Sequence, residues 1–422
     1  MNFSLKLTMP RARYGMDIWL SLAAAILLTW GVVMVASASV AQAEKLTGEP
    51  FYFFYRQLLF IAMGFAAGFI MYCVPTRQWE RSGFLLVGFA IFLLIVVLIP
   101  GIGVKVNSAR RWIDLELFRL QASEPARLAL ILFLAGYITR RQAELQHGFR
   151  GLAKPIALLM LPCLLLLMEP DFGATVILMA VAFLMLFLGG ARVVYFGIAG
   201  LLASGAVALL AVAEPYRLRR LLNFTNPWAD VENGGWQLAQ SLIAVGRGEW
   251  AGVGLGNSVQ KLLYLPEMHT DFIFAILAEE FGLMGVLALV LLFGVMVWRG
   301  FVIGREAEAG GRLFPGFLCY GLSSWLGLQA LINMAVNMGI LPTKGLTLPL
   351  LSYGGSSLII VCAMLGLILR VDYENRAALA GDAEPAPVPK EPKASQRESR
   401  ETAVPRPRRK SPEMPWLAEN GS

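Results

Sequence analysis

Long runs of apolar residues divide this chain, and they limit its fold more than any other feature of the sequence. Ten runs are long enough, or nearly so, to cross a bilayer whose hydrocarbon core is about 30 Å thick. Their ranges are 17–40, 53–74, 83–100, 124–139, 155–168, 172–190, 193–213, 271–298, 313–338 and 352–369. Hydrophobic residues make up 57% of the chain and charged residues 15%, which is typical of a polytopic membrane protein. We therefore predict an all-α membrane protein with about ten transmembrane helices.

The apolar runs also predict the domain organisation. Residues 1–16 lack the layout of a cleaved signal peptide, so we expect the first run to be retained as a membrane helix. Residues 17–370 form the predicted membrane domain, with one long outer loop at 214–270 between the seventh and eighth spans. Residues 371–422 are rich in Pro, Glu, Lys, Arg and Ser, which predicts a disordered cytoplasmic tail.

Basic residues in the loops predict the orientation. An even number of spans places both termini on one side of the membrane, and most loop arginines and lysines fall on that side. They are Arg11, Arg13, Arg77, Arg81, Arg140, Arg141, Arg150, Lys154, Arg192, Arg299, Arg305 and Arg312. By the positive-inside rule this side is the cytoplasm, so both termini are predicted to be cytoplasmic.

Charge and composition argue against several classes of site. The net charge of +7 is spread over short loops and the tail, so it gives no indication of nucleic-acid binding. The four cysteines lie in or beside apolar runs, and the two histidines lie in different loops. Neither a disulfide framework nor a multi-histidine metal site is expected.

Asp271 is the predicted catalytic residue. Thr270 occupies an N-cap position, and we predict Asp271 in the first turn of the following helix, where the helix dipole favours a carboxylate. The apolar neighbours Phe272 and Phe274 disfavour its charged form. A carboxyl group under these opposing effects of the helix dipole and the apolar neighbours, at the start of a membrane helix, is a candidate general base. The alternative is that Asp271 only begins the helix.

Basic residues on the predicted outer side run against the orientation bias. Arg110 and Arg111 stand in tandem beside Trp112, and such a group could bind a phosphate and a sugar face. Arg217, Arg219 and Arg220 lie in the long loop, and Lys344 lies between two prolines near the last span. The alternative for any one of these arginines is contact with lipid phosphates at the interface.

Other polar residues gather on the same side. Asp171 ends a tight turn, where capping of the next helix is the expected role. The segment 236–245 reads as a short interfacial amphipathic helix. Asn333 and Asn337 lie one turn apart, and Ser356 belongs to a group of small polar residues that opens the last span. Such small residues also permit close helix packing, which is the structural alternative.

Several longer motifs carry a family resemblance. They are NSARRWI, EPDFGAT, GGWQLAQSLIAVGRGEWAGVGLG, LPEMHTDFIFAILAEEFG and LPTKGLTLPLLSYGGSS. Together they resemble the SEDS family of shape, elongation, division and sporulation proteins, and they are closer to its division members than to its elongation members. Ala122 stands where the family often has proline, and Ser108 where glycine is common. These departures concern the shape of one outer loop.

The resemblance implies a peptidoglycan glycosyltransferase of the cytoplasmic membrane. It would polymerise lipid II at the outer face during septal cell-wall synthesis, together with the class B penicillin-binding protein FtsI and other divisome proteins. Asp271 matches the family's essential acidic residue, which supports its role as general base. A divalent cation, Mg²⁺ or Mn²⁺, at the pyrophosphate is left open, because the sequence shows no ligand cluster for it.

The remaining predicted site residues form two groups. The predicted substrate-binding residues are Arg110, Arg111, Arg217, Arg220, Gln237, Gln240, His269, Lys344 and Ser356. The residues predicted to line or support the cavity are Glu124, Glu169, Asp171, Glu280 and Asn337.

Two other functions remain as alternatives. A lipid II flippase needs a polar route through the whole membrane, and Glu279 and Glu280 lie two to three turns deeper than Asp271. A non-catalytic divisome scaffold would explain the packed helices and the tail. It gives no reason for a carboxyl group beside so many outward cations.

Overall fold

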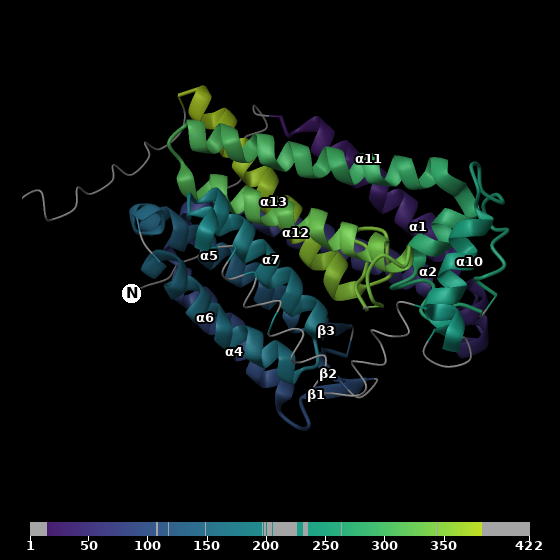
Figure 1. Ribbon diagram of the computed structural model, residues 1–422. Coiled ribbons are helices and arrows are strands. Elements are labelled where there is room, and N and C mark those ends of the chain that lie inside the picture. The colour runs from purple at the N-terminus through teal and green to yellow at the C-terminus, as the bar shows by residue number, and fades with distance from the viewer. Residues whose placement is uncertain are drawn as a thin grey trace, which may run out of the picture. The chain divides into compact units, whose positions relative to one another are not determined.

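The structure is a computed structural model that describes residues 15–106, 109–116, 118–147, 149–195, 197, 200, 205, 226–230, 235–262, 264–343 and 345–381. Helices dominate the described chain (Figure 1). They are α1 (Ile18–Thr47), α2 (Tyr52–Cys73), α3 (Thr76–Arg81), α4 (Gly83–Leu98), α5 (Ser123–His147), α6 (Phe149–Met168), α7 (Phe172–Leu188), the 3₁₀ helix η1 (Pro227–Asp230), α10 (Trp236–Arg247), α11 (Ile273–Ala309), α12 (Leu313–Asn337) and α13 (Gly355–Leu379).

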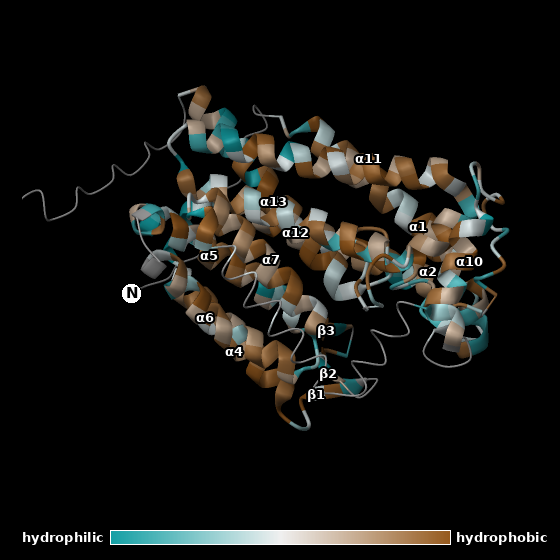
Figure 2. Cartoon of the chain, viewed as in Figure 1, coloured by the Kyte–Doolittle hydropathy of each residue, from teal (hydrophilic) through white to brown (hydrophobic). Residues whose placement is uncertain are grey.

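Long apolar helices coincide with the predicted spans. α1, α2, α4, α5, α6, α7, α11, α12 and α13 each cover one of them. The remaining predicted span, 193–213, lies mostly outside the described residues. In the described part of the chain, α1, α2, α11, α13 and the part of α6 from Gly151 are long and apolar enough to cross a membrane. Figure 2 shows that apolar residues predominate along these helices. The prediction of an all-α polytopic membrane protein is confirmed.

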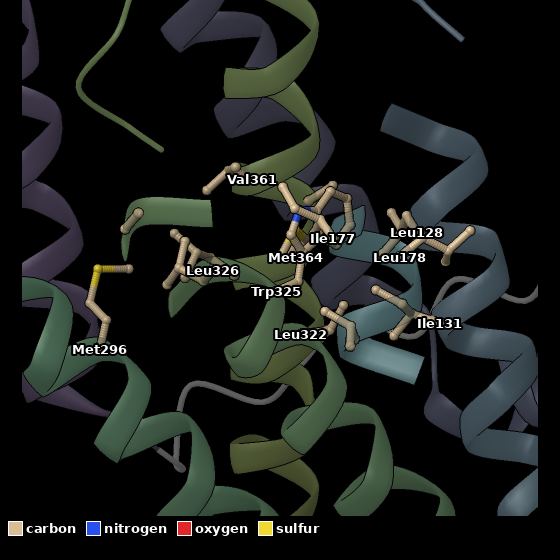
Figure 3. Packing of buried hydrophobic residues seen from close by; sticks show 14 of the residues in the cluster. Leu128, Ile131, Ile177, Leu178, Met296, Leu322, Trp325, Leu326, Val361 and Met364 are labelled. Atoms are coloured by element: carbon tan, nitrogen blue, oxygen red, sulfur yellow. The ribbon is translucent and has the colours of Figure 1, made fainter. Parts of the chain in front are cut away.

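α12 is the most enclosed of the long helices. It packs against α5, α7, α11 and α13, and nearly every residue of its first half is buried. Trp325 fills the space between α12 and its neighbours, where it lies among Leu322, Ile177 and Met364 (Figure 3). Lipid tails are as apolar as these side chains, so the hydrophobic effect does not favour contact between helices within the membrane. Close packing holds the helices together instead.

Small residues bring α2 and α13 together. A Cβ on Gly68 would lie 2.8 Å from the backbone oxygen of Cys362, and a Cβ on Gly366 would lie 2.1 Å from the oxygen of Gly68. Only glycine fits at these positions, so the two backbones approach closely. The start of α13 lies beside residues 119–121, because the Ser356 hydroxyl bonds to the backbone of Gln121 and Arg119.

A three-stranded antiparallel sheet, called the outer hairpin below, forms in a segment that the sequence analysis placed in an outer loop. Its strands are β1 (Gly103–Val106), β2 (Ala109–Asp114) and β3 (Arg119–Gln121), in the order β1-β2-β3. Trp112 pairs with Val104 on one side and with Gln121 on the other. The register shifts between Val104 and Lys105, so Arg111 is an extra residue of β2 at a bulge. Arg110 bonds to the Leu98 carbonyl, whereas Arg111 bonds to the carbonyls of Glu169 and Pro170. Binding of one ligand by both arginines stays a prediction.

α11 is broken at Gly282, which has φ 64° and ψ −161°. The turn that follows α10 docks into the break. The backbone N–H groups of Val253 and Gly254 donate to the carbonyls of Glu279 and Glu280, each at 3.0 Å. Irregular backbone at membrane depth requires such internal partners. The first part of α11, from Ile273 to Glu280, is fully buried in protein.

Candidate active site

Asp271 lies in a turn ahead of α11, which begins at Ile273. The residue at the N-cap position is Phe272, and it makes no side-chain capping bond. The Thr270 hydroxyl instead donates to the Glu267 carboxylate at 2.9 Å. The prediction that Thr270 caps the helix and that Asp271 lies in its first turn is therefore wrong. These residues form a turn ahead of the helix, in which the backbone N–H groups of Thr270 and Phe272 donate to the Glu267 carbonyl.

Two asparagines of α12 hold Asp271 through its main chain. The Asn333 and Asn337 side-chain amides donate to the Asp271 carbonyl at 2.9 and 3.1 Å. Asn333 also donates to the Leu346 carbonyl, and the Ser241 hydroxyl of α10 donates to the Asn337 carbonyl at 2.8 Å. Because these bonds use the backbone of Asp271, they position the residue and leave its carboxylate available. The predicted role of Asn337 as a supporting residue is consistent with this geometry.

The Asp271 carboxylate is half-buried beside a glycine. A Cβ on Gly345 would lie 3.0 Å from Asp271 Oδ2. The pKa of Asp271 is raised to about 7, chiefly by burial and to a smaller extent by the negative charge of Glu267, while Arg111 opposes the rise. A carboxyl group with this pKa exchanges its proton readily at neutral pH. Gly345 and Glu267 were missed by the sequence analysis, since an isolated glycine or glutamate carries no signal for such a role.

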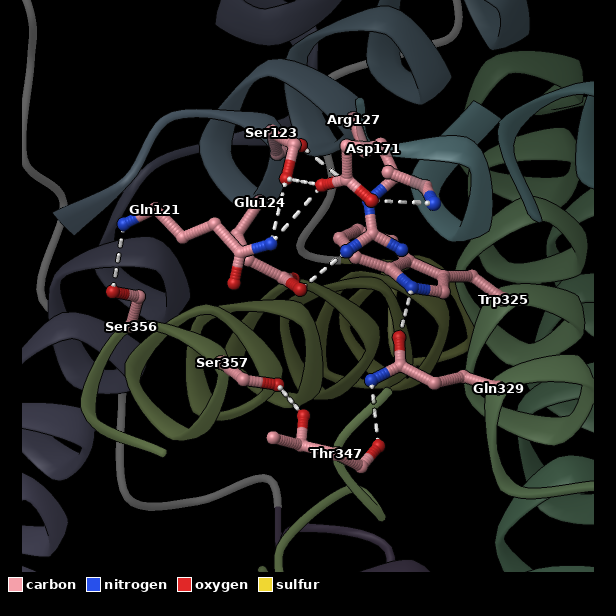
Figure 4. A network of polar contacts seen from close by, with 11 residues as sticks. Gln121, Ser123, Glu124, Arg127, Asp171, Trp325, Gln329, Thr347, Ser356 and Ser357 are labelled. Carbon is pink, nitrogen blue, oxygen red and sulfur yellow. Dashed lines mark hydrogen bonds and ion pairs between the residues drawn. The ribbon is translucent and has the colours of Figure 1, made fainter. Parts of the chain in front are cut away.

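A polar network beside this site links β3, α5 and α7 (Figure 4). Asp171 caps α7 by accepting from Ala174 N at 3.1 Å, which confirms the expected cap. Its other oxygen accepts from the Ser123 hydroxyl at 3.0 Å and from the Gln121 amide at 3.1 Å. The network therefore fixes the end of the outer hairpin against two membrane helices.

A second branch of the network reaches the loop that carries Gly345. Arg127 pairs with Glu124, both side chains are buried, and the guanidinium lies 4.7 Å from the Trp325 ring. Trp325 Nε1 donates to Gln329, whose amide donates to the Thr347 carbonyl at 3.0 Å. Glu124 therefore supports the site indirectly, through Arg127, Trp325 and Gln329. Removing either partner of the buried Glu124–Arg127 pair would leave an unpaired buried charge, which strongly destabilises a fold.

Glu169 is fully buried, and neither of its carboxylate oxygens has a hydrogen-bond partner within the described chain. Burial raises its pKa to about 9, with a smaller contribution from Asp171 and an opposing one from Arg111. Glu169 is therefore protonated at neutral pH.

The charge state of Glu169 predicts how stability depends on pH. The folded chain keeps a proton on Glu169 that the unfolded chain releases above about pH 4.3. Stability should fall as the pH rises from there towards about 9. Glu169→Gln should remove this part of the slope, so thermal unfolding of the wild type and the variant at about pH 5 and pH 8.5 checks it. Parallel pH dependences of the two proteins would show that Glu169 is charged in the fold.

Of the cations predicted to bind substrate, the structure describes Arg110 and Arg111. Arg111 donates from Nε to the Glu169 carbonyl at 3.1 Å and from Nη2 to the Pro170 carbonyl. Arg110 makes a long bond of 3.5 Å to the Leu98 carbonyl. Among the described cations, Arg111 lowers the pKa of Asp271, and it also holds the 169–170 turn. Arg217, Arg220 and Lys344 lie outside the described residues.

Of the other predicted substrate-binding residues, His269, Ser356 and Gln240 are buried and Gln237 is exposed. The His269 ring is buried 4.5 Å from the Phe53 ring, and burial lowers its pKa to about 4. The Ser356 hydroxyl accepts from Gln121 N and donates to the Arg119 carbonyl. Substrate contact by these residues stays a prediction.

Glu279 and Glu280 belong to the junction between α11 and the outer loop. Glu279 pairs with Arg247 at 2.9 Å and accepts from Ser258, and Glu280 pairs with Lys261 at 2.9 Å. The Ser37 hydroxyl of α1 also donates to Glu280. These contacts make Glu280 a structural residue below the site. Within the described chain, no three His, Cys, Asp or Glu side chains converge to hold a metal ion.

Comparison with known proteins agrees with this arrangement. The model of the FtsW/RodA/SpoVE family, described as cell cycle proteins, matches residues 18–377. A relative from Thioalkalivibrio sulfidiphilus, named probable peptidoglycan glycosyltransferase FtsW, is 54% identical over 365 residues, which is 86% of this chain and 91% of that protein. A relative of the same name from Nitrosococcus halophilus is 52% identical over 360 residues, or 85% of this chain and 93% of that protein.

Two solved structures share the fold. One comes from a study titled as the structural coordination of polymerization and crosslinking by a peptidoglycan synthase complex. That chain matches with a TM-score of 0.71 and 28% identity, covering 86% of this chain and 99% of its own length. The Thermus thermophilus rod shape determining protein RodA matches with a TM-score of 0.62 and 28% identity, covering 87% and 99%. This chain belongs to the FtsW/RodA/SpoVE family and is a multi-pass membrane protein of the FtsW type.

Proposed function

We propose that this protein is a peptidoglycan glycosyltransferase that polymerises lipid II at the outer face of the cytoplasmic membrane. We place it at the division septum, with both termini in the cytoplasm and a class B penicillin-binding protein, FtsI, as its partner. The observation that carries the proposal is the Asp271 carboxylate, which is half-buried, has a pKa near 7 and is positioned by hydrogen bonds to its main-chain carbonyl. The names of the FtsW relatives support the reaction class.

The chemistry requires one base and several cations. The acceptor sugar hydroxyl attacks the anomeric carbon of the donor, its proton passes to the Asp271 carboxylate, and the bond to the pyrophosphate oxygen breaks. Direct displacement of this kind inverts the anomeric centre. The undecaprenyl pyrophosphate leaves as an anion, so it needs positive charge more than a proton donor. Arg111 supplies positive charge near Asp271, and the described residues do not form a metal cage there.

The base role predicts a pH dependence with a defined sign. The base acts only when unprotonated, so kcat/KM should rise about tenfold per pH unit below the Asp271 pKa and level off above it. Since that pKa is about 7, the rise should span the acidic range. Glu267→Gln removes the negative charge that helps to raise the pKa, and its profile should shift to lower pH. A wild-type profile that is flat from about pH 5 to 8 would contradict the base role.

Purified protein with labelled lipid II, alone and with its transpeptidase partner, tests the proposal through the appearance of glycan polymer. Lipid II movement across proteoliposomes, without polymer under either condition, would instead favour a flippase. The paired states of Glu279 and Glu280 give these residues a structural explanation that does not require a transport route.

A further inference from the structure

A cavity of about 500 Å³ lies between α4, α5 and α6. Its charged lining consists of Arg140, Arg141, Glu144 and Lys154. On α5, Arg140 follows Glu124 by sixteen residues, about 24 Å along the helix axis. The cavity is therefore distant from Asp271, at the end of the bundle that the basic loops assign to the cytoplasm. Nothing in the proposed glycosyltransferase reaction uses it.

The cavity has an excess of positive charge. Its described lining holds three cations and one carboxylate, and Glu144 is shared between Arg141 at 2.5 Å and Lys154 at 2.8 Å. All three of these side chains are about half exposed. Exposed ion pairs of this kind contribute little to stability, so an arriving anion can compete with Glu144 for both cations.

The Arg140 guanidinium lies against Gly83 and Gly136. A Cβ on Gly83 would lie 3.1 Å from its Nη2, and a Cβ on Gly136 would lie 2.9 Å from its Nη1. Within the described residues it makes one hydrogen bond, of 3.3 Å, to the Glu80 carbonyl. Since a guanidinium carries five N–H donors, Arg140 keeps donors for a further acceptor. α5 also departs from helical geometry at Arg141, with φ −131° and ψ 29°.

The opposite wall is fixed by a proline. Pro155 has no N–H, so the carbonyl four residues earlier, Gly151, loses its helical partner. The Tyr137 hydroxyl donates to that carbonyl at 3.2 Å. This bond connects α5 to α6 and fixes the distance between these two walls of the cavity.

The lining next to the cations is apolar, and one of its side chains, Phe84, is exposed at the surface of the helices. Phe84, which is 81% exposed, and Leu158 border the cavity together with Phe133 and Tyr137. A small soluble anion would need only the cations. A molecule with both a phosphate and a hydrocarbon chain would use the cations and this wall at once.

We propose that this cavity binds the phosphate headgroup of an anionic phospholipid, phosphatidylglycerol or cardiolipin, with an acyl chain lying along Phe84. Arg140 and Lys154 would hold the phosphate oxygens through charge-assisted hydrogen bonds. The inference is independent of the proposed function, because it rests on a different end of the molecule.

Lipid retention by the full-length protein tests the proposal. Native mass spectrometry in detergent should show one phosphatidylglycerol retained in preference to phosphatidylcholine. The double variant Arg140→Gln with Lys154→Gln should bind phosphatidylglycerol at least about tenfold more weakly, since two charged hydrogen bonds are lost. Gly136→Ala keeps every charge but displaces the guanidinium, and it should weaken binding as well. Arg305→Gln, an exposed arginine on α11, is the matched control and should bind like the wild type.

Three outcomes would overturn the proposal. They are equal retention of phosphatidylglycerol and phosphatidylcholine, unchanged binding by the folded double variant, and displacement of the lipid by inorganic phosphate at similar concentration. The last would mark a site for a free anion. The melting temperature of each variant without added lipid establishes that it is folded.

Discussion

Asp271→Asn should lower the rate of glycan polymerisation by about 10²- to 10⁴-fold, the usual cost of losing a general base. Asparagine keeps the size of the side chain but cannot accept the proton of the attacking hydroxyl. The two bonds from Asn333 and Asn337 go to the backbone carbonyl of residue 271, so the variant retains them. Removing a half-buried carboxylate with a raised pKa should leave stability equal or slightly higher.

The measurement is polymer formation from labelled lipid II by purified protein, with the transpeptidase partner present. Asp114→Asn on the outer hairpin is the matched control, because that carboxylate is exposed and should be replaceable without effect on the rate. An Asp271→Asn protein that is folded and keeps a rate within a few-fold of the wild type would exclude the base role. Melting temperature and partner binding separate that outcome from misfolding.

The membrane spans were predictable because hydropathy reports them directly. A helix that faces lipid must be apolar along its span, and the runs of α1 and α2 satisfy this without reference to any other segment. The outer hairpin was not predictable in the same way. Its strands are short and carry mixed residues such as Lys105, Arg110 and Arg119. The pairing, rather than a local preference, creates the sheet.

The candidate site was predictable in its central residue but not in its surroundings. Asp271 was found because it stands between polar and apolar sequence. Its environment depends on Gly345 and Arg111, which are distant in the chain and have no local signature. The tandem Arg110 and Arg111 suggested one binding group, but each arginine bonds to a different part of the chain, Arg110 to the Leu98 carbonyl and Arg111 to the 169–170 turn.

The break in α11 is a clearer case of a long-range determinant. Its sequence, with other glycines at 285 and 294, gives no reason to place the break at Gly282. The turn at 248–254 decides the position by supplying partners for the interrupted helix. Leu283 N donates to the Glu249 carbonyl at 2.9 Å, and Met284 N donates to the Trp250 carbonyl at 3.1 Å. These bonds complement those from the turn to Glu279 and Glu280.

Gly282→Ala should therefore destabilise the protein severely. The backbone at this position, φ 64° and ψ −161°, belongs to a region that only glycine adopts readily, and forcing another residue there costs about 1–3 kcal/mol. The new Cβ would also lie 2.4 Å from Gly252 N and 2.6 Å from the Gly248 oxygen. Both neighbours are main-chain atoms and cannot rotate away, so overpacking adds a further 1–3 kcal/mol or so.

The comparison variant is Gly294→Ala, in the regular part of the same helix, where a Cβ meets nothing within 4 Å. Alanine is favoured over glycine in a helix by about 1 kcal/mol, so this variant should match or exceed the wild-type melting temperature. Gly282→Ala should give little folded protein in size-exclusion chromatography, or a strongly lowered melting temperature. If both variants unfolded at the wild-type temperature, α11 would tolerate a continuous helix at residue 282. The half-helix that follows Asp271 would then owe its position to contacts other than the docked turn.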